Sequence, residues 1–324
     1  MNWHVYPIIF QIKSQLLIGW RKIGNLNQTR LYVPGKVVWA ALTARLARNG
    51  FKELENEPVE NPYQRTGSWL KKNARFTYLF PALKNEVNAT LYPKSTKTGM
   101  VFGKDEIPKS EIQYLLLDSY ASTALDYSFR SSEEGSLHET EYIRPRSRPL
   151  KGTSLQGKLN DPAFDELGAP VHLVGYLILK DEISEQIKIT LNQLQFGGER
   201  RYGWGRACLV NDLANQDTIN KLFDNWEIDN SSNDKLVIKN CIGGYLPAHA
   251  LANQFIEQDL NSGTHDPVDE TKISGKIEPV VGRETRDSRF SGRSISQARI
   301  CWQPGSAVSA DFKAVIGDYG ILES

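Results

Sequence analysis

The sequence predicts an α+β protein, because two strand–helix units and a run of short later strands can be read from its residue pattern. The first unit is a strand over 5–13 followed by a helix over 36–49. The second is the apolar strand 171–179 followed by an amphipathic helix over 181–194. A glycine-rich segment, 196–206, joins that helix to a further strand at 207–210.

Each element has a local justification. The first strand carries Val, Tyr, Ile and Phe in loose alternation. Pro34 suits a helix entrance and Gly50 suits a helix end, so the intervening residues form a bounded helix. The remaining expectations are a strand within 76–91, a helix over 109–127, an exposed or partner-ordered loop over 131–149, an acidic linker or peripheral loop over 211–234, and strands near 236–242, 298–303 and 312–316.

The length of 324 residues is sufficient for two domains, and 40% hydrophobic and 24% charged residues are typical of a packed globular protein. The sequence contains no apolar run of about eighteen residues, so no membrane-spanning helix is expected. Cys208, Cys241 and Cys301 lie far apart, a spacing that predicts reduced thiols in a cytoplasmic protein rather than zinc ligands or disulfides.

The charges are segregated along the chain, although the net charge is only +1. Residues 1–50 contain seven basic residues and no acid, residues 142–158 are also basic, and a third basic stretch lies at 276–299. The compensating acids gather around 212–234. Segregation of this kind creates a positive face, which predicts a polyanionic partner.

The glycine-rich segment 196–206 does not fit a dinucleotide site. A dinucleotide fingerprint or P-loop follows a strand and opens a helix, whereas this loop follows a helix and enters a strand. A polynucleotide suits it better, because glycines let a backbone approach phosphates and arginines supply planar donors. Tyr202 and Trp204 offer faces for unpaired bases, although Trp204 is equally suited to packing on the core.

At this loop the sequence resembles the RAMP (repeat-associated mysterious protein) superfamily of CRISPR effector proteins. Residues 197–205 match the Gly-Gly-x-Arg-x-x-Gly-x-Gly pattern of that superfamily. Tyr32-Val33-Pro34-Gly35 is similar to its Tyr-Ile-Pro-Gly element, although the continuation, Lys36 to Ala40, departs from the usual Ser-Ser-Leu sequence. A basic segment at 149–159 is similar to a third family feature.

The resemblance implies a ferredoxin-like (RRM-like) βαββαβ domain with insertions over 1–210 and a smaller, degenerate domain of related fold over 211–324. Residues 298–308 are similar to the ending of the two-domain subunits in type III effector complexes. Such a subunit grips the 5′ handle of the CRISPR RNA and contacts the large polymerase-like subunit. Its other implied neighbours are backbone RAMP subunits and, indirectly, target RNA, with no membrane partner.

The sheet of this domain and the glycine-rich loop are expected to hold single-stranded RNA, and no metal or cofactor is expected. The expected RNA-binding residues lie near the first strand, at the first helix, in the basic loop and in the glycine-rich loop. They are Lys13, Arg21, Lys22, Lys36, Arg144, Arg146, Gly197, Gly198, Arg200, Arg201, Tyr202, Gly203, Trp204 and Arg206. Arg148 belongs to the same basic loop.

The sequence favours a binder over a catalyst, because its five histidines are scattered and nothing selects one acid among Asp105, Asp118 and Asp126. Three alternatives stay open. One is a filament-backbone subunit that binds the guide and cuts target RNA. The second is a metal-independent endoribonuclease that processes CRISPR RNA, for which His4 is the histidine to watch. The third is a scaffold that contacts only protein.

Overall fold

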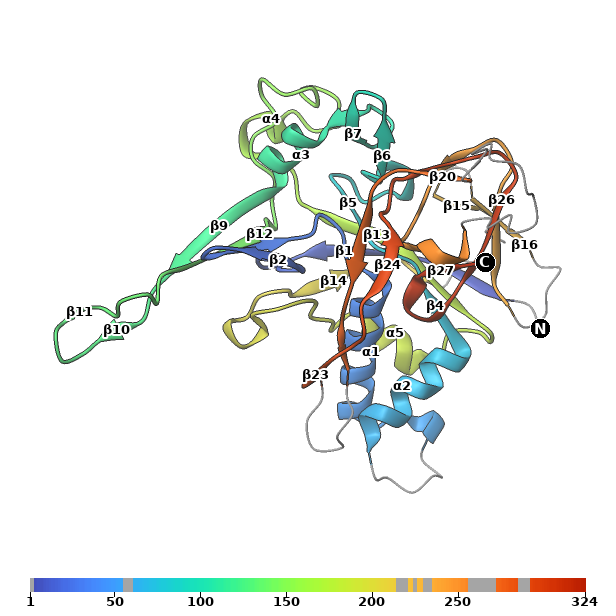
Figure 1. The fold of residues 1–324 in the computed structure, drawn as a ribbon, viewed down its shortest axis with the longest axis horizontal. Coiled ribbons are helices and arrows are strands. Elements are labelled where there is room, and N and C mark those ends of the chain that lie inside the picture. Colours follow the sequence, from blue (N-terminus) through green and yellow to red (C-terminus); the bar gives the residue numbers. More distant parts are fainter. Residues whose placement is uncertain are drawn as a thin grey trace, which may run out of the picture.

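The structure is a computed structural model, and it describes residues 3–54, 61–213, 221–223, 226–229, 235–255, 272–284 and 292–324. A central antiparallel sheet lies between helices on one face and C-terminal strands on the other (Figure 1). This mixture of helices and sheets agrees with the predicted α+β class.

The central sheet has the strand order β14–β1–β13–β4, and β5 pairs with the opposite end of β13. Every pairing in it is antiparallel. The predicted strands at 5–13, 171–179 and 207–210 are all confirmed. The members are β1 (His4–Ile12), β4 (Ala74–Phe76), β5 (Phe80–Ala82), β13 (His172–Leu179) and β14 (Ala207–Leu209).

Three helices cover one face of this sheet: α1 (Gly35–Asn49), α2 (Pro62–Asn73) and α5 (Glu185–Leu191). The bounds of α1 confirm the predicted helix, which is entered after Pro34 and ends before Gly50. The second predicted helix, 181–194, is shorter than expected, because Ser184 caps α5 by accepting a hydrogen bond from the amide of Ile187.

The central sheet is buried on both faces. On β1, Tyr6 and Ile8 pack toward the helices, whereas Val5 packs toward the C-terminal strands. All eight residues of β13 are buried, since Tyr176 and Ile178 also belong to the cluster shared with the C-terminal strands. The sequence had led us to expect single-stranded RNA on this sheet. That expectation is wrong for the faces of the sheet, because protein already covers both of them.

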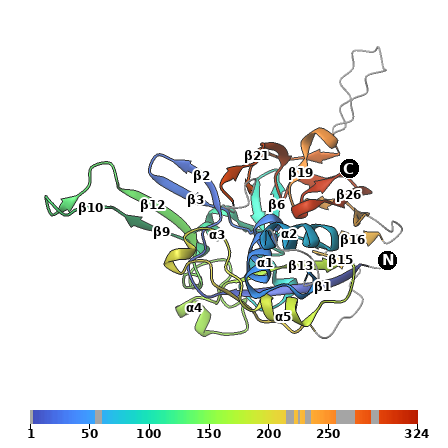
Figure 2. The ribbon, with the colours of Figure 1, turned by 90° about the horizontal axis from the view of Figure 1, so that it is seen from below.

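A second sheet extends into a long projecting hairpin, which is visible in both views (Figures 1 and 2). The predicted helix over 109–127 is wrong beyond Leu116, and the predicted loop over 131–149 contains strands. The cause is the pairing of Leu117 with Ile143 and of the residues beyond them, which holds both segments extended. The elements are α3 (Lys109–Leu116), β2 (Gly19–Ile23), β3 (Leu26–Thr29), β9 (Leu117–Ser122) and β12 (His138–Ile143), with β10 (Leu125–Asp126) and β11 (Ser131–Ser132) near the tip.

A small lobe is formed by elements that lie before and after α3 in the chain. It contains β6 (Pro93–Thr96), β7 (Gly99–Phe102), β8 (Ile107–Pro108) and α4 (Ala163–Leu167). Short 3₁₀ turns occur at η1 (Lys52–Leu54), η2 (Val87–Ala89), η3 (Arg200–Tyr202), η4 (Ala252–Gln254) and η5 (Asp318–Gly320).

The C-terminal part builds an eight-stranded sheet in the order β15–β16–β17–β26–β27–β19–β24–β21. Its strands are β15 (Lys221–Leu222), β16 (Trp226–Asp229), β17 (Val237–Asn240), β19 (Ala250–Leu251), β21 (Ile277–Val280), β24 (Arg299–Trp302), β26 (Phe312–Ile316) and β27 (Leu322–Glu323). Smaller pairings join β18 (Gly244–Tyr245), β20 (Ile273–Ser274) and β25 (Ala307–Val308), and β22 (Arg283–Glu284) with β23 (Ser294–Ile295).

The three late strands predicted from the sequence are confirmed as β17, β24 and β26. The predicted linker over 211–234 is partly wrong, since β15 and β16 join the sheet there, and its remaining residues from 214 on lie outside the described part. Among the described residues after 210 no α-helix occurs, so the helices of a second ferredoxin-like domain are not found there. No helix in the described ranges has the length and apolar character needed to cross a membrane.

Candidate nucleic-acid interface

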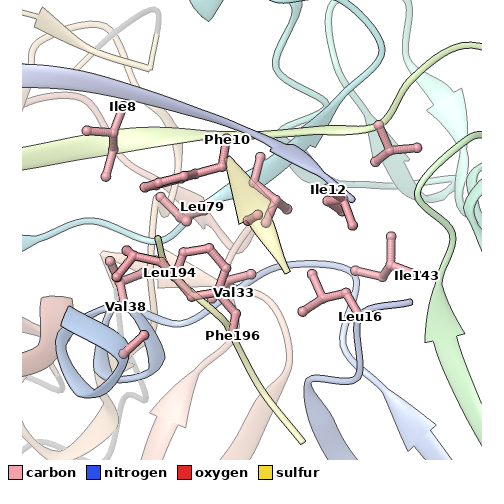
Figure 3. Close-up of a cluster of buried hydrophobic side chains, with 14 of the residues drawn as sticks. Ile8, Phe10, Ile12, Leu16, Val33, Val38, Leu79, Ile143, Leu194 and Phe196 are labelled. Atoms are coloured by element: carbon pink, nitrogen blue, oxygen red, sulfur yellow. The ribbon is translucent and has the colours of Figure 1, made fainter. Parts of the chain in front are cut away.

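The glycine-rich loop is anchored to the core at its first residue. Phe196 is fully buried, and its ring meets that of Phe10 edge-on with the ring centres 5.3 Å apart. Figure 3 shows both rings among the apolar side chains between the central sheet and α1. Such an edge-to-face contact contributes about 0.5–1.5 kcal/mol beyond the burial of the rings. The loop therefore leaves the core from a fixed point.

Backbone hydrogen bonds tie the loop to residues 13–17, which directly follow β1. Because these bonds hold both arms of the loop, the residues between them project from a rigid frame. The bonds, with the amide donor first, join Gly198 to the carbonyl of Leu17 (2.9 Å), Gly205 to that of Gln15 (2.6 Å) and Lys13 to that of Arg206 (2.8 Å).

Two of the glycines are needed for this frame. Gly197 has a φ of +74°, and a Cβ there would lie 2.0 Å from the carbonyl oxygen of Leu17. Gly205 has a φ of +78°, and a Cβ there would lie 1.9 Å from the carbonyl oxygen of Phe196. These glycines permit close approach of one backbone to another, and their predicted approach to phosphates stays a prediction. Beside Gly203, by contrast, a Cβ would meet nothing within 4 Å.

The 3₁₀ turn η3 displays the charged side chains of the loop. It begins after Glu199, which adopts a left-handed conformation with a φ of 52°. Arg200 and Arg201 are exposed, and Tyr202 is 81% exposed. No ion pair between described residues involves these arginines or the exposed Arg206, so their charge is available to an anion.

Trp204 is half-buried and packs on the projecting hairpin rather than on the core. Its ring centre lies 5.2 Å from that of Tyr142 on β12 and 6.3 Å from that of Tyr120 on β9, both in edge-to-face geometry. The tip of the hairpin adds two exposed aromatic residues, Tyr127 and Phe129. The hairpin and its aromatic residues were missed in the sequence, because the polar segment 138–143 does not look like a strand.

Of the basic residues expected near β1, Lys13 is the one held beside the loop, because its backbone amide donates a hydrogen bond to the carbonyl of Arg206. Lys13, Arg21 and Lys22 are all exposed. Arg21 lies on β2, where its guanidinium carbon sits 4.1 Å from the ring centre of Trp20.

The arginines of segment 144–148 are engaged within the protein. Arg144 pairs with one carboxylate oxygen of Asp118, and Arg148 lies 3.5 Å from the other. Arg146 donates a hydrogen bond to the carbonyl of Gly168. The expected arm that becomes ordered only upon binding is therefore wrong for this segment, because these contacts and β12 already order it.

Lys36 at the start of α1 faces the C-terminal part. Its ammonium nitrogen lies 5.0 Å from the ring centre of Tyr319. Burial lowers the pKa of Lys36, and the charges of Arg299 and Lys71 lower it further against the opposing effect of Glu284. The described contacts of Lys36 thus join α1 to the C-terminal strands, and none of them joins Lys36 to the glycine-rich loop.

A buried polar network joins the two parts of the chain. Glu278 on β21 accepts hydrogen bonds from Arg30 (2.5 Å) and from the indole of Trp20 (3.0 Å). His249 Nε2 lies 2.6 Å from the same carboxylate, and Tyr78 donates to His249 Nδ1 over 2.7 Å. This pattern assigns the Nε2–H tautomer to a neutral His249.

The pKa shifts in this network follow from burial and charge. Burial lowers the pKa of His249, and the nearby charge of Arg30 acts in the same direction, against the hydrogen bond to Glu278. Burial would raise the pKa of Glu278, but the hydrogen bond from His249 and the charge of Arg30 outweigh it and hold that pKa at about 2. Tyr32 of the Tyr-Val-Pro-Gly element completes the group by accepting a hydrogen bond from Arg30.

The acids and histidines considered for catalysis are dispersed. Asp105 pairs with Lys158, Asp118 pairs with two arginines, and Asp126 accepts amide hydrogen bonds at the hairpin tip. His172 and His249 are buried, and His265 lies outside the described residues. Within the described ranges, no group of three or more His, Cys, Asp or Glu side chains is suited to hold a metal ion.

Comparison with solved structures shows what the fold resembles. A chain of the type III-B Cmr-β complex, determined by cryo-electron microscopy with cognate target RNA and AMPPnP, matches with a TM-score of 0.51 and 12% identity over 93% of this chain and 85% of that one. The same complex with cognate target RNA alone gives a TM-score of 0.51 at 12% identity, covering 93% and 86%.

The Csm3–Csm4 subcomplex of the type III-A interference complex also matches, over 96% of this chain and 94% of that one, but with a TM-score of only 0.39 at 14% identity. No family model and no curated protein sequence matches the chain. The chain therefore has a fold similar to that of a chain from the type III-B Cmr-β complex.

Proposed function

We propose that this protein is a non-catalytic RNA-binding subunit of a type III CRISPR effector complex and that it grips the 5′ handle of the CRISPR RNA. The observation that carries the proposal is the glycine-rich loop. Its backbone is fixed, Tyr202 projects from it, and Arg200 and Arg201 project without ion pairs to the described residues. Support for the complex comes from the likeness of the fold to chains of Cmr-β bound to target RNA.

The topology of the central sheet supports a ferredoxin-like domain. The order β14–β1–β13–β4, with α1 between β1 and β4 and α5 between β13 and β14, is the order of a βαββαβ unit. In this unit the loop sits between the last helix and the last strand. The second, degenerate domain stays a prediction, as does the boundary at residue 210.

The chemistry of the site suits single-stranded RNA. Exposed guanidinium groups supply charge-assisted hydrogen bonds to phosphates, and exposed Tyr202 offers a face on which a base can stack for about 1–3 kcal/mol. The aromatic residues of the projecting hairpin continue the same surface from Trp204 toward Tyr127. We infer that the RNA leaves the loop along this hairpin, while the large subunit and backbone RAMP subunits contact other faces.

The proposal of a binder rather than a ribonuclease draws support from the engaged acids. Asp118, on the first strand of the projecting hairpin, is already paired with Arg144 and Arg148. A carboxylate held in this way is poorly placed to bind a metal ion. Incubation of the protein with repeat RNA, once with Mg²⁺ and once with EDTA, tests the point: intact, shifted RNA in both fits the proposal, and discrete cleavage in either contradicts it.

The handle assignment is tested on the native assembly. We would purify the chain with its partners, sequence the RNA that accompanies it and map ultraviolet crosslinks. Crosslinks from the 5′ end of the guide to Tyr202 or Arg21 are expected. Crosslinks spread along the guide would instead indicate a backbone subunit, and the absence of any RNA would refute the proposed function. Lys97→Ala with Lys313→Ala, which removes two exposed lysines, provides a control for general loss of positive charge.

A further inference from the structure

A second cluster of cations surrounds Trp20, away from the backbone frame of the glycine-rich loop. The guanidinium of Arg21 lies 4.1 Å from the ring centre of Trp20, and the ammonium of Lys109 lies 5.8 Å from it. Lys276 directly precedes β21, on which Glu278 accepts the indole N–H of Trp20 over 3.0 Å. Arg21 and Lys109, which lie far apart in the sequence, thus bring their cations to one indole, and the charge of Lys276 acts on Lys109 from a third segment.

The cluster has little counter-charge of its own. Glu278 and Glu141 are the acids whose charges act on Lys109, but Glu278 already binds Arg30 at 2.5 Å and His249 at 2.6 Å. Glu141 accepts the amide of Thr29. No ion pair between described residues involves Arg21, Lys109 or Lys276, although the charges of Glu141 and Glu278 act on Lys109 from a distance.

The protonation of Lys109 reflects this crowding. Burial lowers the pKa of the half-buried Lys109, and the charges of Lys276 and Arg21 lower it further, against smaller opposing effects of Glu141 and Glu278. Like charges that are held together in this way repel one another, and an anion placed between them would remove the repulsion.

Trp20 and Arg21 are held in place by hydrogen bonds of their side chains, and Lys276 by one of its backbone. The indole of Trp20 is fixed through its N–H to Glu278, and the backbone of Lys276 accepts a hydrogen bond from the amide of Gln303 over 2.8 Å. Arg21 is oriented by a hydrogen bond to the side chain of Gln28 (2.6 Å). Donors fixed before binding lose less conformational entropy when a ligand arrives.

We propose that Arg21, Lys109 and Lys276 around Trp20 form a phosphate-binding site that holds a backbone phosphate of the bound RNA at the junction between the N-terminal sheets and β21. This inference rests on the proposed function, since it takes RNA as the source of the phosphate. It adds two residues, Lys109 and Lys276, that the sequence did not single out as RNA contacts. One strand of RNA would then be held at two points, the glycine-rich loop and this cluster.

The test is the salt dependence of RNA binding. Each phosphate of a single strand that a protein neutralises adds about 0.7 to the slope of log affinity against log salt. The RNA recovered from the native assembly is labelled and titrated with wild-type protein and with Lys109→Ala/Lys276→Ala. Because the cluster holds one phosphate, we expect the double variant to lower the slope by about 0.7, whereas Lys109→Arg/Lys276→Arg should retain it.

The controls separate this inference from the proposed function. Lys97→Ala/Lys313→Ala removes two exposed lysines elsewhere and should leave the slope unchanged. An unchanged slope for Lys109→Ala/Lys276→Ala, together with weaker binding by Arg200→Ala/Arg201→Ala, overturns the phosphate site alone. Failure of the wild-type protein to bind RNA refutes the proposed function itself.

A free anion is the other source of a phosphate group. Inorganic phosphate is titrated into RNA-free protein while tryptophan fluorescence is followed, with Trp20→Phe identifying the contribution of Trp20. Saturable binding that requires Lys109 and Lys276, combined with an RNA slope that these lysines do not affect, would assign the site to free phosphate and overturn its assignment to RNA.

Discussion

Two arginine-rich segments, 144–148 and 200–206, look alike in the sequence but differ in the folded chain. In the first, Arg144 and Arg148 share the carboxylate of Asp118, and the third arginine donates to a backbone carbonyl. In the second, every arginine is exposed and none forms an ion pair among the described residues. The first segment uses its arginines to hold the base of the hairpin, and the second keeps them for a ligand.

The difference teaches that an excess of arginine predicts an anion site only where the fold brings no acid to it. Segment 144–148 contains no acid, yet the fold places Asp118 beside it through the pairing of β9 with β12. The backbone bonds of the glycine-rich loop go to segment 13–17, which also contains no acid. Arg30 is the extreme case, since Glu278 and Tyr32 enclose it.

The largest effect is expected from a substitution that disrupts the backbone frame of the glycine-rich loop, which carries the arginines of segment 200–206. Gly205→Ala places a Cβ 1.9 Å from a carbonyl oxygen at a φ of +78°, so the loop cannot keep its conformation. We expect RNA binding to be lost and the free energy of unfolding to fall by about 3 kcal/mol or more. Gly203→Ala, at a φ of +83° but with open space, should cost only about 1 kcal/mol. Equal losses in denaturant unfolding would contradict the assigned roles.

The next largest effect is expected when matched pairs of arginines are removed from segments 200–206 and 144–148. Arg200→Ala/Arg201→Ala removes two uncompensated charges, so RNA affinity should fall by about 10- to 100-fold with unchanged thermal stability. Arg144→Ala/Arg146→Ala removes the same charge from the engaged segment and should lower stability while RNA affinity stays within about twofold. Fluorescence anisotropy and thermal unfolding of both variants decide the matter. The opposite result would reverse the comparison.

The third prediction concerns the buried network around Arg30, where acid should lower the free energy of unfolding. His249 has a lowered pKa, so the stability that it contributes is complete above its unfolded pKa of about 6.5 and is lost as pH falls below that value. Glu278, with a pKa of about 2, loses its contribution only between about pH 4.5 and 2. Urea unfolding between about pH 7.5 and 5.5 should therefore show a slope of up to about 1.4 kcal/mol per pH unit. His249→Gln should reduce this slope, and an unchanged slope would place the acid sensitivity in other groups.

The smallest expected effect concerns the shared carboxylate. Asp118→Ala breaks two partly exposed ion pairs, so the free energy of unfolding should fall by about 1 kcal/mol. Asp105→Ala breaks one pair with Lys158, whose two side chains are about half exposed, and should change stability very little. A loss for Asp105→Ala as large as that for Asp118→Ala would show that sharing the carboxylate adds nothing.

Local pattern was sufficient to predict the elements around the loop. The boundaries of α1 follow from Pro34 and Gly50, and β13 follows from its apolar run, so the placement of the loop between a helix and a strand could be predicted. The exposure of Arg200 and Tyr202 also agrees with their predicted role as contacts.

Long-range pairing accounts for what could not be predicted. Leu115, Leu116 and Leu117 continue a helical pattern, and only the pairing of Leu117 with Ile143 shows that the helix has ended. The roles of Gly197 and Gly205 likewise depend on carbonyl groups that approach them in space. Arg21 and Lys109 approach Trp20 from separate segments, so no spacing in the sequence links them.

The double burial of β13 has a consequence for synthesis of the chain. Tyr176 and Ile178 are covered by residues such as Phe223 and Ile316, which leave the ribosome after the whole central sheet has been made. Until then the nascent chain presents an apolar sheet face to water, which is the kind of surface that aggregates or recruits chaperones. The C-terminal strands thus cover the apolar face that would otherwise make the N-terminal part prone to aggregate. The two parts of this chain are therefore better regarded as one cooperative unit than as separable modules.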